Sequence, residues 1–556
     1  MLQHAQKADV VVVGAGVAGL SAALRLTAAG VSTAVLEAAP FVGGRMSTEK
    51  VDGFRLDRMG QLLFTSYPEL RTTPGLDDLV LRPFAPGVLV HGGGRLHHAG
   101  GPEGVGRGAR GAHTAHEQKL EGALAGALDV ATAAARGGRR NVPPLIPAIP
   151  AIPPLPGGPA DRLAPAPLPE FPEVPQCPEV AEVLESSGSA GLPPFPEPRA
   201  AAPARVRAGA AAAIRMTGLR ARRPRLGRVR PRRALGAVAG PLGGPGDRAR
   251  LASALAGIAA TPVERLLTRA EMPAAEALSA RGVPGRALEG FLRPLLAALL
   301  CDPELAGSSR CADLALRAWA TGRLCVPEGG AEAVPELLAR ALPPGTVHTG
   351  VRVTSVSTTS VTTAEHGEFR CRAVLLATDA RTAAELLPGL RVPDFHPVTV
   401  LHHTTDEAPD TGSFLLLDAE RGGPVAHTSV VSRVDPTRAP AGRTLVSSTV
   451  LGAPPRNVDD AAREHLARLY GVPTRAWETL AVHHTAAAVP VMRPPLDPRR
   501  SVRLLAGLYV CGDHRDTGTV QGALHSGRRA SAAILRDLGA GTGLRPGEPV
   551  PRPRAA

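Results

Sequence analysis

The feature that most constrains the fold of this chain is a glycine-rich turn that directly follows a short run of valines. Residues 10–13 form a continuous apolar stretch, as expected for a strand buried on both faces of a parallel sheet. The turn contains Gly14, Gly16 and Gly19 in the spacing GxGxxG, and residues 20–29 then repeat apolar side chains at helical intervals. This order of strand, turn and helix predicts the first half of a βαβ unit.

The glycines of this turn favour the binding of a dinucleotide, because each has a separate physical use. Gly14 permits the tight turn, Gly16 lets the backbone approach a pyrophosphate, and Gly19 lets the helix pack closely on the strand. The N-terminus of the helix then faces the anion. A second apolar strand, 33–36, ends on Glu37, where a carboxylate can accept hydrogen bonds from ribose hydroxyls. The unit predicts a dinucleotide-binding domain and leaves NAD and FAD open; the alternative is the glycine-rich turn of an ordinary βαβ unit.

A second pair of glycines, Gly43 and Gly44, is followed at once by Arg45. Two glycines allow the chain to run close to a phosphate, and a guanidinium group neutralises phosphate charge. A domain that binds only NAD has no use for a second phosphate clamp, so this turn favours FAD. The alternative is a surface turn with a solvated arginine.

A third glycine-bearing turn lies near the C-terminus, after the apolar strand 508–511. Gly512 and Asp513 end this strand, and a helix is expected to start near Val520. The carboxylate of Asp513 can accept hydrogen bonds from a chain of hydroxyl groups. The first turn of the helix directs its positive dipole end at whatever lies above, through the N–H groups of Gln521, Gly522 and Ala523. A flavin ring placed there gains a partner for its reduced, anionic form; a capped surface helix is the alternative.

The net charge of +13 is concentrated in one arginine-rich segment. Residues 205–233 contain eleven arginines and no acidic residue, so the remainder of the chain is close to neutral. A basic chain raises nucleic acid or an anionic membrane as partners. No aromatic residue interleaves this segment, so base stacking has no platform and no nucleic-acid partner is expected.

Residues 143–198 contain eighteen prolines, a density that forbids helix and central strand and favours polyproline II or disorder. We expect residues 96–245 to form a disordered, low-complexity insertion rich in proline and arginine, and residues 541–556 to form a disordered tail. Three interpretations of the insertion stay open: a flexible insertion, a linker, or a sequence translated out of frame from a GC-rich gene.

The six cysteines show no CxxC pair and no metal-ligand spacing, so no metal site is predicted and the thiols are expected to be buried in a reducing compartment. The N-terminus lacks the charged segment and cleavage site of a signal peptide. The most apolar later stretch, 291–301, contains Arg293 and is too short to cross a bilayer. We therefore expect a cytoplasmic protein.

The motifs at the two ends of the chain together resemble the flavin-containing amine oxidase superfamily, which includes monoamine oxidases, protoporphyrinogen oxidases and phytoene-type desaturases. The resemblance is carried by GAGVAGLSAALRL, LEA and VGGR near the N-terminus, and by YVCGD and GTVQGALHSGRRA near the C-terminus. The segments LDRMGQ and VPEGGAEAVPELLARAL are similar to further motifs of the family. The resemblance covers residues 1–95 and 247–540.

This resemblance implies non-covalently bound FAD and adds site residues that the three turns do not give. By the resemblance, Gly60 and Gln61 lie beside the flavin and Val353 lies against the adenine. The residues placed near the ribitol and the ring are Gly512, Asp513, Gln521 and Ala523.

The expected fold is α/β, with a Rossmann-like FAD-binding domain built from discontinuous parts of the chain and an α+β substrate domain. The parts of the FAD-binding domain are predicted at 1–95, 331–385 and 499–540. The substrate domain is predicted to combine a helical region at 246–330 with an antiparallel sheet at 386–498.

Within the superfamily, the sequence favours a desaturase over an amine oxidase. Amine oxidases of the family place a lysine near the flavin and an aromatic cage around it, whereas this chain has no lysine after Lys119 and only three tyrosines. Residues 261–309 resemble the helical substrate region of the desaturase branch. We expect hydride transfer from a substrate C–H bond to flavin N5, on a lipophilic polyene, isoprenoid or tetrapyrrole-type small molecule.

No catalytic residue is assigned, because positioning supplies most of the catalysis in a desaturation. The nearest candidates for a general base are His483, His484 and His514, with a surface or core role as the alternative. Five leucines could line a lipophilic pocket or form core: Leu292, Leu295, Leu296, Leu299 and Leu300.

Two other functions stay open, namely flavin amine oxidation and a catalytically inactive FAD-binding chain. Peripheral membrane contact and the oligomeric state stay open as well.

Overall fold

The computed structural model describes residues 8–100, 241–498 and 500–540. The predicted insertion lies outside the described residues except for the two ends of its range, and the predicted tail lies wholly outside them. All described residues belong to one unit of the chain, which comprises residues 1–140 and 237–556.

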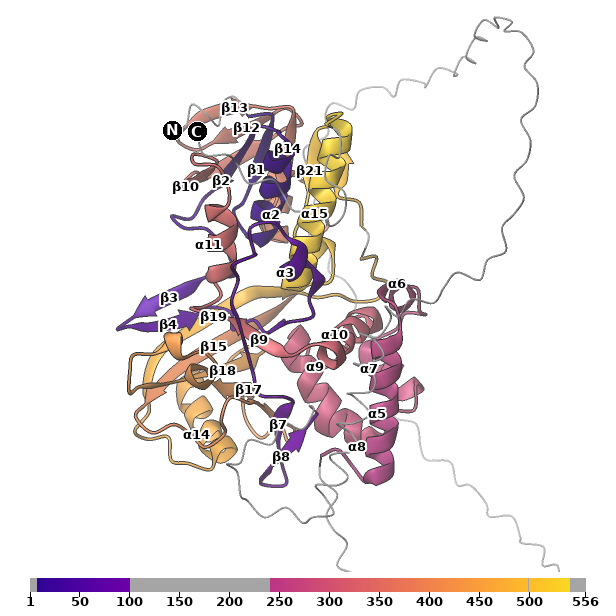
Figure 1. The fold of residues 1–556 in the computed structure, drawn as a ribbon, viewed down its shortest axis with the longest axis vertical. Helices are drawn as coiled ribbons and strands as arrows, with labels where there is room; N and C mark the ends of the chain where they lie inside the picture. The colour runs from indigo at the N-terminus through magenta and orange to yellow at the C-terminus, as the bar shows by residue number, and fades with distance from the viewer. Residues whose placement is uncertain (1–7, 101–240, 499, 541–556) are drawn as a thin grey trace, which may run out of the picture. The chain divides into compact units, whose positions relative to one another are not determined.

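The first glycine turn belongs to a six-stranded sheet whose strands come from distant parts of the chain, as Figure 1 shows. In spatial order they are β10 (Val347–Thr349), β2 (Thr33–Glu37), β1 (Val10–Val13), β14 (Ala373–Leu376), β21 (Leu508–Val510) and β20 (Arg503–Leu505). Neighbouring strands are parallel except for β20, which runs antiparallel to β21. Since the carboxyl ends of parallel strands meet at one edge, the turns after β1, β2 and β21 fall together there.

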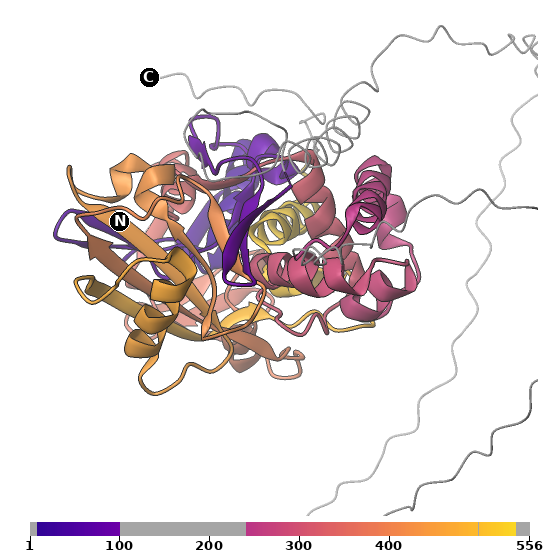
Figure 2. The same cartoon turned by 90° about the horizontal axis from the view of Figure 1, so that it is seen from below.

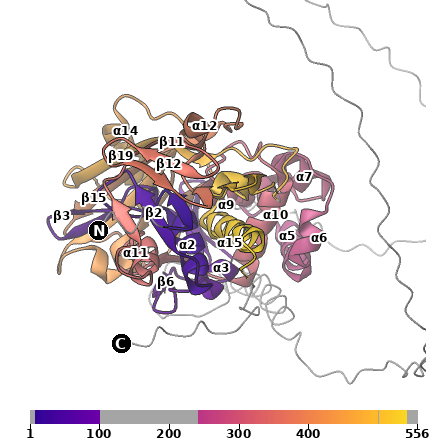
Figure 3. The same ribbon diagram turned by 90° about the horizontal axis from the view of Figure 1, so that it is seen from above.

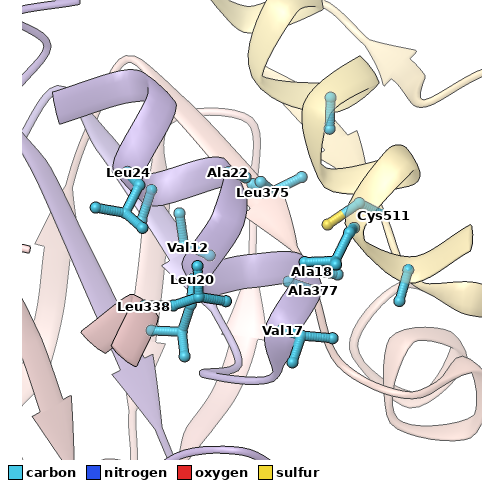
Figure 4. Packing of buried hydrophobic residues seen from close by; sticks show 14 of the residues in the cluster. Val12, Val17, Ala18, Leu20, Ala22, Leu24, Leu338, Leu375, Ala377 and Cys511 are labelled. Carbon is cyan, nitrogen blue, oxygen red and sulfur yellow. The ribbon is translucent and has the colours of Figure 1, made fainter. Parts of the chain in front are cut away.

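Helices cover one face of this sheet. Val12 of β1 packs in a buried cluster with residues of α2 (Val17–Ala28), α11 (Ala333–Arg340) and α15 (Val520–Asp537). Figure 4 shows this cluster, with Leu338 of α11 beside Leu20 of α2. Figure 3 shows α2 and α15 next to each other. The continuous apolar character of β1 is explained by burial on this face and on the opposite one.

A small antiparallel sheet covers the opposite face. Its strands are β11 (Val353–Val356), β12 (Ser360–Thr363) and β13 (Gly367–Arg370). Val11 and Val13 pack there, because successive side chains of a strand point to opposite faces.

The second large sheet of the fold has seven strands. In spatial order its strands are β19 (Glu478–Pro490), β15 (Phe395–Thr405), β18 (Thr444–Leu451), β17 (Val425–Val430), β16 (Leu415–Asp418), β7 (Val88–Gly92) and β8 (Arg95–Ala99). All neighbours are antiparallel except β16 and β7. Helix α14 (Val458–Tyr470) packs on one face of this sheet through a cluster that includes Leu466 and Trp477.

A group of helices follows residue 240 and packs beside the sheet; in Figure 2 the magenta helices lie opposite the orange strands. They are α5 (Pro245–Ala260), α6 (Val263–Leu267), α7 (Ala274–Ala280), α8 (Gly285–Ala287), η1 (Leu288–Leu292), α9 (Arg293–Leu300) and α10 (Ser309–Thr321). Their apolar faces form one buried cluster with Val88 of β7 and with Leu415 and Leu417 of β16.

The remaining elements are short. They are β3 (Thr48–Val51), β4 (Phe54–Asp57), β5 (Leu63–Phe64), β6 (Leu81–Pro83), β9 (Leu324–Pro327), α3 (Pro68–Thr72), α12 (Ala380–Leu386), α13 (Val431–Val434), η2 (Pro436–Arg438) and η3 (Asp513–Arg515). Polar side chains cap three helices at their N-termini, because each accepts a hydrogen bond from a first-turn N–H: Ser308 before α10, Asp379 before α12 and Thr519 before α15.

The stretch 347–356 is apolar at both ends but forms two strands, β10 and β11, because Gly350 between them has a φ of 73° and donates its N–H to the carbonyl oxygen of Ala39 at 2.9 Å. Strand β19 is long because it pairs along most of β15.

Two boundaries differ from those predicted. Helix α2 begins at Val17, directly after the turn, whereas the sequence pattern placed its start at residue 20. Strand β8 continues to Ala99, past the boundary predicted at residue 95, because it pairs with β7 over its whole length. Within the part of the chain that the structure describes, no helix is long and apolar enough to cross a membrane.

Candidate functional site

One cavity of about 420 Å³ brings together most of the predicted site residues. Its walls come from the carboxyl ends of β1, β2, β14 and β21, from the N-terminus of α15, and from α9, β17, β18 and β19. The predicted residues that line it are Gly14, Gly16, Glu37, Gly43, Gly44, Arg45, Gly60, Gln61, Val353, Gly512, Asp513 and Ala523. Those that do not line it are Gly19, Gln521 and Gly522.

The first two glycine turns lie side by side at one end of the cavity. The N–H of Gly43 donates to the carbonyl oxygen of Ala15 at 2.9 Å. A Cβ on Gly14 would lie 2.9 Å from the carbonyl oxygen of Ala377, whereas a Cβ on Gly16 would meet no protein atom within 4 Å. Gly16 therefore presents open backbone to the cavity, which is the condition for close approach of a phosphate.

The carboxylate of Glu37 is fixed at the end of β2 by two backbone N–H groups. Ala15 donates to one oxygen at 2.7 Å and Ala39 donates to the other at 2.9 Å. Val353 lines the same end of the cavity from β11. A carboxylate held in this way keeps lone pairs for further donors, such as hydroxyl groups.

Gly19 allows close packing of α2 and does not line the cavity. A Cβ at this position would lie 2.1 Å from the carbonyl oxygen of Gly14 and 3.0 Å from the Cβ of Ala377. Its absence lets α2 approach the turn and β14, the use that the sequence assigned to the third glycine.

Arg45 and Asp513, which both line the cavity, form an ion pair. Arg45 Nη2 donates to Asp513 Oδ1 at 2.6 Å, and Nη1 donates to the carbonyl oxygen of Ala488 at 2.8 Å. Burial disfavours the charged form of both groups, but their mutual attraction outweighs it. The pKa of Asp513 therefore lies below its ordinary value and the pKa of Arg45 above it.

The start of α15 faces the cavity through Thr519, Val520 and Ala523. Two of the three N–H groups that the sequence directs at the cavity, those of Gly522 and Ala523, are already hydrogen-bonded within the helix. Thr519 caps the helix, so its hydroxyl accepts from Gly522 N–H at 3.1 Å and its carbonyl accepts from Ala523 N–H at 2.8 Å. The side chain of Gln521 points elsewhere, since its Oε1 accepts from the backbone N–H of Glu69 at 3.0 Å.

Gly60 and Gln61 reach the cavity from the segment after β4. Gly60 has a φ of 55°, and a Cβ there would lie 3.5 Å from Thr449 Oγ1. The Oε1 atom of Gln61 is buried and makes no hydrogen bond. A buried acceptor without a donor is costly in a protein of fixed conformation, so this atom points to a ligand that donates.

The opposite end of the cavity is mainly apolar and comes from the helical group and the seven-stranded sheet. Its lining residues are Met59, Leu62, Ala298, Leu299, Cys301, His427, Thr449 and Val489, and Ala488, which accepts from Arg45, lies between the two ends. Burial raises the pKa of the Cys301 thiol to about 12, so the thiol is neutral. Of the five leucines considered from the sequence, Leu299 lines the cavity and Leu292, Leu295 and Leu296 are core. Leu300 is partly buried against that core and does not line the cavity.

The three histidines suggested by the sequence do not line the cavity, and a different one does. His484 Nδ1 is hydrogen-bonded to Thr399 Oγ1 at 2.9 Å, and His483 Nε2 lies 3.6 Å from a carboxylate oxygen of Glu49. His514 is buried behind Gly512 and is absent from the lining. The histidine that lines the cavity is His427 of β17. Its position depends on how this strand packs, and the only sequence signal for it is its place in a stretch of alternating apolar residues.

A glycine turn and a helix N-terminus at the carboxyl edge of a parallel sheet, both facing one cavity, define a dinucleotide-binding α/β protein. The chain belongs to the family described as flavin containing amine oxidoreductase, whose sequence model matches residues 236–535. Residues 12–73 match the model of an NAD(P)-binding Rossmann-like domain. The chain is thus an FAD-dependent oxidoreductase, as its sequence predicts.

A curated relative with sequence similarity is the putrescine oxidase of Kocuria rosea. It is 55% identical to this chain over 62 residues, which are 11% of this chain and 13% of the relative. This chain therefore spans only a small fraction of that relative's length in the match.

Solved structures are similar over nearly the whole chain. An oxidoreductase from Methanosarcina mazei has a TM-score of 0.57 at 14% identity, with 95% of this chain and 99% of that one covered. A protein assigned as a protoporphyrinogen oxidase from Exiguobacterium has a TM-score of 0.55 at 14% identity, with 96% and 99% covered. A putrescine oxidase bound to putrescine has a TM-score of 0.53 at 15% identity, with 95% and 99% covered. At such identities the similarity establishes the fold.

Proposed function

We propose that this FAD-dependent oxidoreductase is a dehydrogenase of the desaturase type, which removes hydrogen from an apolar, uncharged small molecule. The observation that carries the proposal is the composition of the cavity. One end supplies backbone and charged groups suited to a dinucleotide, and the other end is lined mainly by apolar side chains.

In this proposal the FAD lies along the first end without a covalent link. Gly14, Gly16, Gly43 and Gly44 would cradle its phosphates, and Glu37 would accept from the ribose. Arg45 is fixed by Asp513 near the glycine turns, where its positive charge favours the pyrophosphate. Residues such as Gly512, Gln521 and Gly522 would act by shaping the backbone around the flavin, with Gly19 permitting the packing beneath it.

The flavin ring would lie between Gln61 and the start of α15. Bound flavin supplies an acceptor for hydride at N5. The unpaired Oε1 of Gln61 would accept a hydrogen bond from a ring N–H, and the positive end of the α15 dipole would favour negative charge on the reduced ring. The chain's task is then to hold a C–H bond of the substrate close to the ring and to exclude water.

The charges of the cavity argue for an uncharged substrate. The described carboxylates in its lining are Glu37, Asp379 and Asp513. Glu37 binds backbone N–H groups, Asp379 caps α12 and Asp513 pairs with Arg45. None of them stands at the apolar end, where an alkylammonium substrate would need a counter-charge. A lipophilic polyene, isoprenoid or tetrapyrrole-type molecule is the class we propose.

Amine oxidation is the second candidate, because the chain shares a short, highly identical segment with a putrescine oxidase. Against it, the one tyrosine in the described cavity lining is Tyr67, and no lysine is part of that lining. An aromatic cage of the amine oxidase kind therefore has one member at most among the described residues.

We propose that residues 1–95, 331–385 and 499–540 form the FAD-binding domain and that 246–330 with 386–498 form the substrate domain. Strand β7, at the end of the first part, pairs in the seven-stranded sheet of the substrate domain. A location in the cytoplasm and a peripheral contact with a membrane are further parts of the proposal.

Anaerobic titration of the purified, FAD-loaded protein tests the proposal. The probes are polyprenoids, porphyrinogens, and primary amines or polyamines, and the readout is bleaching of the flavin absorbance. Bleaching by a polyprenoid or porphyrinogen is expected. Bleaching by amines alone would favour the second candidate, and a yellow protein that no probe reduces would indicate a catalytically inactive FAD-binding chain.

A further inference from the structure

His427 is a buried polar side chain with an unpaired ring nitrogen. It lines the cavity from β17, its side chain is almost fully enclosed at 5% exposure, and its Nδ1 atom makes no hydrogen bond. Proteins pair nearly all buried polar atoms, so an unpaired nitrogen in a side chain that lines a cavity indicates a partner supplied by a ligand.

Another buried histidine of the same sheet shows the contrast. The ring of His402 bonds through Nε2 to the carbonyl oxygen of Asp57 and through Nδ1 to Ser447 Oγ, both at 2.9 Å. Its polar atoms are satisfied inside the protein, and it does not line the cavity. A structural role accounts for His402 and leaves the unpaired Nδ1 of His427 unexplained.

The surroundings of His427 define what it can bind. Thr449 stands opposite it on β18 and also lines the cavity, while Leu417 stands opposite it on β16. Cys301 and Leu299 line the same end from α9 and the residue that follows it. Two charged groups of the described chain come near this end, and both are paired. Arg45, which donates to the carbonyl oxygen of Ala488, pairs with Asp513, and Asp418 of the neighbouring strand β16 pairs with His465.

The ring is therefore neutral at physiological pH. Burial lowers the pKa of His427 to about 4, and no nearby charge opposes this effect. A neutral imidazole has one donor and one acceptor nitrogen, which matches a hydroxyl group and also a carbonyl oxygen. It offers no charge to an ammonium or a carboxylate.

We infer that His427, with the Thr449 hydroxyl beside it, is a specificity-determining residue that binds an uncharged oxygen of the substrate. The substrate is then an apolar molecule that carries a hydroxyl or carbonyl group. The inference rests on the proposed function, because it names a recognition group for the uncharged, apolar substrate proposed there.

A matched set of unreactive ligands tests this inference on the FAD-loaded protein. Hexan-1-ol, hexane and hexylammonium share one chain and differ only in the head group. Binding is measured by calorimetry and by the perturbation of flavin absorbance. We expect hexan-1-ol to bind about tenfold more tightly than hexane, in line with one hydrogen bond to a buried neutral group, and hexylammonium to bind more weakly than the alcohol.

Variants assign the preference to the ring. His427→Phe keeps an aromatic ring and removes both nitrogens, so the ratio of alcohol to alkane affinity should fall to about one. His427→Asn keeps a donor and an acceptor and should retain the preference. Thr428→Val is the matched control, because Thr428 is the next residue on β17 and its hydroxyl points away from the cavity, to Tyr470 and Ser448.

A measurement on the unaltered protein complements the variants in case one of them fails to fold. The ¹⁵N signals of the His427 ring should shift on addition of hexan-1-ol and stay in place with hexane. The inference is overturned if the ratio of alcohol to alkane affinity is unchanged in His427→Phe, or if the ¹⁵N signals of the ring do not shift with hexan-1-ol. The proposed function is not contradicted by either result. Loss of FAD from His427→Phe with an unchanged ratio overturns the inference too, and assigns the ring to the flavin. If hexylammonium binds most tightly, or if none of the three probes binds, the proposed function is overturned as well.

Discussion

Arg45 and Asp513 lie 468 positions apart in the chain and form an ion pair with 2.6 Å between Nη2 and Oδ1. Arg45 follows the second glycine turn, and Asp513 follows β21, so the pair joins both turns in one cavity wall. Arg45 also donates to Ala488 at the end of β19, which fixes its guanidinium from the side of the substrate sheet. The pair thus links the two ends of the chain to both parts of the proposed site.

Removing one charge of this pair should destabilise the protein. In Asp513→Asn the guanidinium of Arg45, whose side chain is 29% exposed, loses the counter-charge of a carboxylate that is itself 9% exposed. Breaking a fully buried pair typically costs about 3 to 5 kcal/mol, so we expect a loss near the lower end of that range. The amide also weakens the position of Arg45 beside the proposed pyrophosphate, so FAD content should fall. Urea unfolding and the flavin absorbance of the purified variant measure the two effects.

Glu328→Gln provides the matched control for this prediction. It removes one charge from the Arg82–Glu328 pair, which is 2.9 Å long and lies at the surface with side-chain exposures of 43% and 30%. Surface pairs contribute about 1 kcal/mol or less, so stability and FAD content should hardly change. Equal losses in both variants would contradict the special role of the buried pair.

Substituting Gly19 or Gly16 of the first turn by alanine should have different effects on folding and on FAD binding. In Gly19→Ala the new Cβ would lie 2.1 Å from the carbonyl oxygen of Gly14, so the fold itself should be damaged. In Gly16→Ala the Cβ meets no protein atom within 4 Å and φ is an ordinary −73°, so the fold should survive. The methyl group would then occupy the space proposed for the pyrophosphate, and only FAD affinity should fall.

Circular dichroism melting and FAD titration separate these outcomes. We expect a lower melting temperature for Gly19→Ala, and an unchanged one with at least about tenfold weaker FAD binding for Gly16→Ala. Normal FAD affinity in Gly16→Ala would show that the phosphates lie elsewhere.

The dinucleotide end of the site was predictable because its geometry is local. Gly14 and Gly16 impose a backbone shape within a few residues, and their order after a buried strand is visible in the sequence. Arg45 and Asp513 were each predictable from their own turn, but their contact depends on how β21 joins β1 through β14. No local pattern contains that contact.

The apolar end was not predictable for the same reason. The place of His427 depends on the register of β17 against β18 and on the packing of α9, which are tertiary properties. The role of Gln521 was likewise decided by a distant group, the backbone N–H of Glu69. Leu295 and Leu299 lie one helical turn apart, and the sequence could not tell which of them would face a cavity.

Stability should decrease in mild acid because of three buried histidines. Burial lowers the pKa of His402, His427 and His514 to about 4, below the ordinary value of 6.5. The unfolded chain therefore binds protons at a higher pH than the folded chain, so the stabilisation is complete above about pH 6.5 and is lost as the pH falls through 4. The full effect is on the order of 3 kcal/mol for each histidine.

Urea unfolding of the FAD-loaded protein across this range measures the effect. His427→Asn, which cannot take up a proton there, should show a shallower loss of stability between about pH 6.5 and 4 than the unaltered protein. Identical pH profiles would mean that His427 does not remain neutral in the folded protein.

Substitutions of two leucines of α9 should affect stability and ligand binding separately. Leu295 is fully buried in the core shared by the helices and the sheet, so Leu295→Ala should lower the free energy of unfolding by about 2 to 5 kcal/mol. Leu299 is only partly buried and lines the cavity, so Leu299→Trp should fill space there at a smaller cost in stability. We expect Leu299→Trp to keep FAD and to bind hexan-1-ol about tenfold more weakly, whereas Leu295→Ala should bind it normally whenever folded. Unaltered hexan-1-ol binding in Leu299→Trp would contradict the assignment of this end of the cavity to the substrate.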